Sequence, residues 1–206
     1  DTLRFNHKHD DPQSGFVYVA WQEFKVTDVD VTVEIGVRHL GRTPMPYGIG
    51  LHPWFPGGDD VSVAFIASDS FATDEDMLPT ARTVIDLGRD FSDGRMIRHN
   101  LALDAHYAGW HLEADMVWQD AGYSVKMIAS DSLSNVQFYI PEDGKTFCVE
   151  PVSHVPNVHN RPEFKEHGDL VVLDKNQTLS GTMTLVPSLL ELPDSGLVDD
   201  DEVVGI

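Results

Sequence analysis

The sequence contains little cysteine, little positive charge and no long apolar run. Cys148 is the one cysteine among 206 residues, which excludes a disulfide within the chain and favours a reducing compartment such as the cytoplasm. No apolar stretch approaches the roughly 18 residues that a membrane helix needs, so we expect no membrane partner. Apolar residues still make up 41% of the chain, which is typical of a globular domain.

Lysine and arginine together number 14, against 34 aspartates and glutamates, for a formal net charge of −20. Such a surface repels phosphate backbones, and we therefore expect no nucleic-acid partner. An uncharged small molecule such as a sugar is not excluded by this field. The sequence also lacks a Walker-type phosphate loop, a GxSxG elbow and a dinucleotide-binding fingerprint. No motif therefore indicates a nucleotide-dependent enzyme or a serine hydrolase.

Helical periodicity is scarce as well, and residues 162–167 form the best helical candidate, a single turn. The dominant period is two. Apolar side chains occupy every second position from residue 29 to residue 37, with polar or small residues between them, as in a half-buried strand. We expect this strand to form a hairpin with the strand before it, through the short polar link at residues 25–28.

Further strands are predicted between turn signals rich in glycine and aspartate. The predicted strands cover residues 15–24, 29–37, 61–67, 83–87, 111–118, 123–130, 136–140, 147–150, 170–173 and 179–186. Many short strands with almost no helix indicate an all-β, antiparallel β-sandwich. We expect one domain over residues 1–192 and an acidic tail over 193–206, and the polar first ten residues resemble the middle of a connection rather than the natural start of a domain.

The first candidate for chemistry is His52, at the end of the segment PMPYGIGLHPWF (residues 44–55). Its prolines and glycines stiffen the chain and permit close backbone approach, and the following proline favours an extended histidine. A histidine beside the aromatic ring of Trp54 suits a proton donor to a sugar, whose apolar face stacks on aromatic rings. A histidine that is only hydrogen-bonded within a loop is the alternative.

The second candidate is Glu150, which ends the apolar run Phe147, Cys148, Val149. Partial burial there raises the pKa of a carboxyl and makes it a better proton acceptor near neutral pH. A solvent-exposed glutamate is the alternative, and Cys148 itself reads as a core residue. Asp104 is a third candidate, as an acceptor for sugar hydroxyls or as an exposed turn residue.

Ten histidines require metal binding to be considered. His7 and His9 lie two apart, which places both rings on one face of a strand. No third ligand stands near them in the sequence, so we expect no metal site.

These segments resemble the signatures of the aldose 1-epimerase (galactose mutarotase-like) family. Residues 44–55 resemble its glycine-rich histidine motif and residues 147–154 its VEPxSH motif, with His52 and Glu150 98 residues apart. Asp104 resembles the family's substrate-binding aspartate. His39 stands where an asparagine is usual, and residues 175–177 replace a usual Pro-Gly-Glu turn.

The resemblance implies a galactose mutarotase-like sandwich that interconverts the α and β anomers of a hexose. It implies Glu150 as catalytic base, His52 as catalytic acid, Asp104 and Trp54 as substrate-binding residues, and no cofactor, because both steps are proton transfers. We expect the two catalytic side chains to converge on one sheet face with room for a pyranose. Family members are longer at the N-terminus, where an arginine and a further histidine face the sugar, so the resemblance implies a missing N-terminal segment.

Three other functions fit the sequence pattern. A non-catalytic carbohydrate-binding sandwich would use exposed rings such as Trp54, Tyr107 and Trp110. An accessory or catalytic sandwich of a polysaccharide-acting enzyme would present a longer cleft. A metal-dependent β-sandwich enzyme would hold an ion on its histidines.

Overall fold

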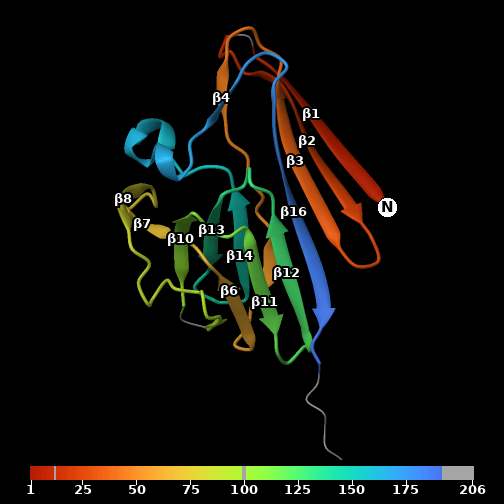
Figure 1. Ribbon diagram of the computed structural model, residues 1–206, viewed down its shortest axis with the longest axis vertical. Helices are drawn as coiled ribbons and strands as arrows, with labels where there is room; N and C mark the ends of the chain where they lie inside the picture. The colour runs from red at the N-terminus through yellow and green to blue at the C-terminus, as the bar shows by residue number, and fades with distance from the viewer. Residues whose placement is uncertain (12, 99–100, 192–206) are drawn as a thin grey trace, which may run out of the picture.

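Antiparallel strand pairing dominates the computed structural model, which describes residues 1–11, 13–98 and 101–191 (Figure 1). The larger sheet has the order β1-β2-β3-β16-β12-β11-β6-β9, with strands Thr2–Asp10, Val17–Val26, Val31–His39, Thr178–Leu189, Tyr123–Ala129, Glu113–Trp118, Val61–Phe65 and Arg95–Ile97. The smaller sheet has the order β5-β14-β13-β10-β7-β8, with strands Trp54–Pro56, Thr146–Val152, Asn135–Ile140, Leu103–Ala108, Asp69–Thr73 and Pro79–Thr83.

The remaining elements are short. β4 (Met45–Tyr47) pairs with β15 (Val171–Leu173), and two 3-10 helices follow each other, η1 (Val158–Asn160) and η2 (Pro162–His167). The predicted turn at residues 162–167 is therefore confirmed, as is the all-β sandwich. No helix within the described ranges is long and apolar enough to cross a membrane.

The core lies between the two sheets and is built by the alternation of side chains along each strand. On β13, Val136, Phe138 and Ile140 point into it and are almost fully buried. Phe138 packs edge-on against Phe65 of β6 in the larger sheet and against Phe147 of β14 in its own sheet. The intervening residues of β13 must then face the other side of the smaller sheet, away from this core.

Alternation located most long strands within a few residues, and the predicted hairpin is the β2–β3 pair, which joins Val26 to Val31 at its closed end. Two predictions are wrong. Residues 84–87 lie outside any strand, because β8 ends at Thr83. The polar first residues form β1, which pairs with β2 over its whole length, since backbone hydrogen bonds do not depend on side-chain polarity. The predicted tail and its boundary lie outside the described residues.

His39 shows how the loop after β3 is fixed. It is fully buried, with Nδ1 2.8 Å from the hydroxyl of Tyr47 and Nε2 2.8 Å from the carbonyl oxygen of Thr43. The ring thus ties the end of β3 to β4, and β4 leads directly into the segment that carries His52. Figure 1 shows this path from the tall strands β1–β3 down to the smaller sheet.

Candidate active site

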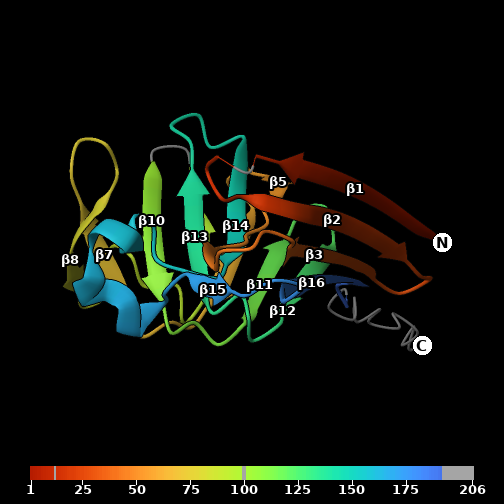
Figure 2. The same cartoon turned by 90° about the horizontal axis from the view of Figure 1, so that it is seen from above.

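Strand β14 places Glu150 on the outer face of the smaller sheet. Its neighbour Val149 points into the core and is fully buried, so Glu150 points the other way. Glu150 is the register partner of Gln137 on β13, and the two side chains share one face. β10, β13 and β14 lie side by side in Figure 2, and this outer face carries the candidate site.

The backbone before His52 runs antiparallel to the end of β14. Leu51 N donates to the Pro151 carbonyl at 3.0 Å, and Ser153 N donates to the Ile49 carbonyl at 2.9 Å. This pairing brings two segments about one hundred residues apart in sequence into contact, as expected for an antiparallel ladder. It delivers the imidazole of His52 to the carboxyl of Glu150.

Gly48 makes this approach possible. A Cβ atom built on it would lie 2.1 Å from Cε1 of His154, which no real side chain tolerates. The glycine therefore allows the segment to pass directly over the imidazole of His154.

Nε2 of His52 lies 3.3 Å from Oε1 of Glu150. The two side chains differ in their access to water, since 56% of the His52 side chain is exposed but 12% of that of Glu150. They converge on one face and touch each other, with no pyranose-sized gap between them.

Burial raises the pKa of Glu150 to about 7, and the negative charge of Asp104 adds to the effect. Both influences penalise the carboxylate form. A carboxyl that titrates near neutral pH is a competent proton acceptor and donor. The 3.3 Å contact places the imidazole of His52 directly beside this carboxyl.

Asp104 lies on β10, two strands from Glu150, and is the register partner of Tyr139. Its Oδ1 accepts a short hydrogen bond from Nε2 of Gln137. Because Gln137 also faces Glu150, it bridges the space between the two carboxyl groups. This bridging role could not be found from the sequence, since it depends on the pairing of β10, β13 and β14.

Trp54 forms an aromatic wall beside His52. Their rings stack with centroids 5.4 Å apart and an interplanar angle of 15°, and Trp54 is 56% exposed. Tyr139 meets the same indole edge-on at 6.0 Å. The arrangement offers a flat apolar surface next to the acid–base pair.

The other rings suggested for sugar binding are not available. Tyr107 is fully buried and Trp110 is 4% exposed, both within the core. Periodicity alone did not reveal which side of its strand each ring occupies.

Three potential metal ligands gather at the site. Atoms of His52, Cys148 and Glu150 lie within 4.8 Å of one another, and this is the group of three ligands found among the described residues. Burial raises the pKa of the Cys148 thiol to about 12, with a further contribution from Glu150, so the thiolate that a metal prefers is disfavoured. His7 and His9 lie on β1 against Tyr18 and belong to no such group within the described chain.

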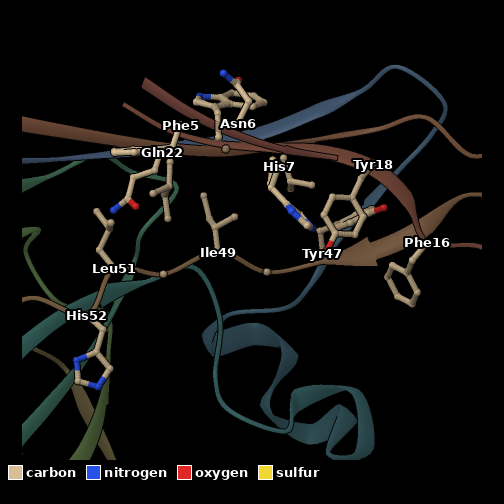
Figure 3. Close-up of a pocket in the computed structure, with 17 residues that line it drawn as sticks. Phe5, Asn6, His7, Phe16, Tyr18, Gln22, Tyr47, Ile49, Leu51 and His52 are labelled. Carbon is tan, nitrogen blue, oxygen red and sulfur yellow. The ribbon is translucent and has the colours of Figure 1, made fainter. Parts of the chain in front are cut away.

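A pocket of about 840 Å³ adjoins the site along β1–β3 and the segment from Tyr47 to His52. Figure 3 shows His52 at one end and Phe16 and Tyr18 at the other, with Ile49 between them. Its walls are mainly apolar and aromatic. Glu150 is not part of its lining, so this pocket lies beside the acid–base pair rather than around it.

Together, the fold and the site define an antiparallel β-sandwich with a histidine–carboxyl pair on the outer face of its smaller sheet. The chain belongs to the aldose 1-epimerase family, whose model matches residues 1–186.

The chain is also similar to known proteins in sequence and in structure. The uncharacterized protein YphB of Escherichia coli K12 is 26% identical over 194 residues, which cover 90% of this chain and 64% of YphB. The crystal structure of a candidate aldose 1-epimerase from Escherichia coli K12 superposes with a TM-score of 0.83 at 25% identity, covering 92% of this chain and 66% of that one. A galactose mutarotase-like protein of Clostridium acetobutylicum shares the fold, with a TM-score of 0.81 at 13% identity over 92% and 63% of the two chains. The present chain therefore spans slightly less than two thirds of these relatives.

Proposed function

We propose that this protein is an aldose 1-epimerase that interconverts the α and β anomers of a hexose, with Glu150 as base and His52 as acid. The observation that carries the proposal is the 3.3 Å contact between their side chains, together with the rise in the pKa of Glu150 to about 7. An acid and a base that work near neutral pH are what ring opening of a hemiacetal requires.

The chemistry explains why the two groups stand so close. Glu150 takes the proton from the hydroxyl oxygen on C1, and His52 gives a proton to the ring oxygen. Both oxygens are bonded to C1, so the two catalytic groups must reach two oxygens on the same carbon. The C1–O bond of the ring breaks, the C1–C2 bond rotates, and closure with the proton transfers reversed yields the other anomer.

The side chains around Glu150 and His52 bind the sugar in this proposal. Trp54 offers its exposed ring to the apolar face of the pyranose. Asp104 and Gln137 offer an acceptor and an amide to its hydroxyl groups. The carboxyl groups of the site and the net charge of −20 favour an uncharged sugar over a sugar phosphate.

The direct test is anomer exchange. A freshly dissolved anomer of glucose or galactose is followed by polarimetry, with and without the protein, in a metal-free buffer. Acceleration of mutarotation supports the proposal. Saturable sugar binding without acceleration would instead favour a carbohydrate-binding sandwich, for which the exposed Trp54 is the specific argument.

A further inference from the structure

A chain of polar side chains runs behind the candidate site. Nδ1 of His106 lies 3.1 Å from Oε1 of Gln137, and its Nε2 lies 3.2 Å from Oδ1 of Asn135. Gln137 in turn donates through Nε2 to Asp104. His106 and Asn135 are almost completely buried, so water cannot replace these partners.

The imidazole of His106 is neutral in this position. Burial lowers its pKa to about 4, despite its hydrogen bonds to Gln137 and Asn135, and the nearby His154 adds to the effect. The ring of Phe71 packs against it with centroids 5.6 Å apart. A neutral imidazole has one N–H donor and one acceptor nitrogen, so it can donate to one of the two amide groups and must accept from the other.

Asp104 determines which of the two amide groups accepts the hydrogen bond from the imidazole N–H. An ionised carboxylate only accepts hydrogen bonds, so the NH₂ group of Gln137 must stay on Asp104 and its oxygen must face His106. The proton of the imidazole is therefore on Nδ1. In the structure Asn135 presents Oδ1 to Nε2 and donates through Nδ2 to the hydroxyl of Ser134. Turned by half a rotation of its amide, it donates to Nε2 and accepts from that hydroxyl, so each of these groups keeps a partner.

We propose that His106, as its Nδ1–H tautomer, is a positioning residue that fixes the Gln137 amide so that the amide nitrogen serves Asp104 and the sugar. The catalytic part of this inference rests on the proposed epimerase function. Gln137 is the register partner of both His106 and Glu150, so a rotated amide would disturb the site between the two carboxyl groups.

The tautomer is measured directly by ¹⁵N NMR of the histidine rings in the full 206-residue chain at pH 7, with His106→Asn used to assign the signal. We expect the Nδ1 signal of a protonated nitrogen and the Nε2 signal of an unprotonated one. A protonated Nε2, or a doubly protonated ring, would overturn the proposal. This reading needs no catalytic activity, so it stands apart from the outcome of the epimerase assay.

Two matched variants then test the effect on the sugar site. The amide nitrogen of His106→Asn occupies the place of Nδ1 and can still donate to Gln137, whereas that of His106→Gln corresponds to Nε2 and cannot. We expect His106→Gln to raise KM, or the sugar Kd if exchange is absent, by about tenfold, the equivalent of one lost hydrogen bond, while kcat changes less. His106→Asn should stay within about threefold of the wild type on the same scale. Equal losses in both variants would contradict the positioning role.

A double-mutant cycle separates positioning from general stability. In a Gln137→Ala background, His106→Gln should have no further effect on KM or Kd, because the amide that it positions is gone. Additive effects of the two substitutions would show that His106 acts by another route. Thermal unfolding of each variant identifies any that fail to fold. The ¹⁵N measurement is made on the wild type, and either His106→Asn or His106→Gln, whichever folds, assigns its signal.

Discussion

Asp104 on β10 and Glu150 on β14 face the same side of the smaller sheet. Their two strands flank β13. After burial, the charge of Asp104 is the second cause that raises the pKa of Glu150 to about 7. A group that we assign to sugar binding thus also tunes the proposed base. This coupling makes the pH dependence of activity a test of the site.

The acid limb of the pH–activity profile should have its midpoint near pH 7, since Glu150 is active as a base only when deprotonated. Asp104→Asn removes a negative charge and should move this midpoint to lower pH, while Asp104→Glu keeps the charge and should leave it in place. Mutarotation rates from pH 5 to 9 supply both profiles. A midpoint that does not move in Asp104→Asn would contradict the coupling.

Glu150→Gln should abolish most mutarotation while the chain still folds. A positioned acid or base contributes on the order of 10²–10⁴-fold, and the amide cannot accept the proton. Polarimetry on a freshly dissolved anomer measures the loss. Glu113→Gln is the matched control, because Glu113 is exposed on β11 and pairs with Lys126 at the surface of the other sheet. Full activity in Glu150→Gln would refute its role.

His52→Gln should lower kcat by a similar factor of about 10²–10⁴ with little change in stability. The side chain is more than half exposed, so its replacement removes little buried contact, and the amide nitrogen of Gln, which corresponds to Nε2, can still donate to Glu150. Comparison of kcat with the urea midpoint of the same variant checks both statements. A variant that is unfolded, or one that retains wild-type turnover, would oppose the assignment of His52 as the acid.

The stability of the protein should also report on Glu150. Its pKa is raised from an ordinary value of 4.5 to about 7 on folding, so between these values the native state binds more protons than the unfolded chain. The free energy of unfolding therefore falls as pH rises from about 4.5 to about 7, because the native state must ionise a carboxyl that folding keeps protonated.

Glu150→Gln does not titrate and should gain stability relative to the wild type between pH 4.5 and 7, by up to about 3 kcal/mol. Urea denaturation of both proteins at pH 5 and pH 8.5 measures the difference. The same stability gap at both pH values would mean that the pKa of Glu150 is not raised by folding.

Gly48→Ala should destabilise the segment that carries His52. The added Cβ would lie 2.1 Å from the ring of His154, and overpacking of this kind costs about 1–3 kcal/mol. Combining Gly48→Ala with His154→Ala removes the clash and should recover most of the loss that the glycine substitution causes by itself. Thermal unfolding of the two single variants and the double variant tests this, and purely additive losses would argue against the contact.

Side-chain alternation was the most informative local signal. It located the long strands β2, β3, β11, β12 and β16 within a few residues, because a strand with one wet face shows its period directly. Three of the four three-residue strands, β4, β5 and β9, were missed because they are too short to display a period, whereas β15 was predicted from its apolar run. Alternation also missed β7, β10, whose last four residues are all buried, and the polar edge strand β1.

The candidate site was foreseen only in part. His52, Glu150, Asp104 and Trp54 stand in recognisable segments, and the structure gathers them on or beside one sheet face. Gln137 and His106 were not predicted as site residues, although both stand in segments that resemble the family, since only the pairing of β10 with β13 brings their side chains together. Tyr107 and Trp110 were suggested as sugar-binding rings and are buried.

The amino-acid sequence by itself determined local features: which residue types are present, and which face of its strand each side chain occupies. The neighbours Gln137 and Phe138 on β13, for example, point to opposite faces. Tertiary structure decided which strands are neighbours and in what register, and thereby placed Glu150 beside His52 and Gln137 between two carboxyl groups. The physical reason is that strand pairing is made by backbone hydrogen bonds that are the same for every residue. Register therefore depends on the packing of the whole core and not on any single segment.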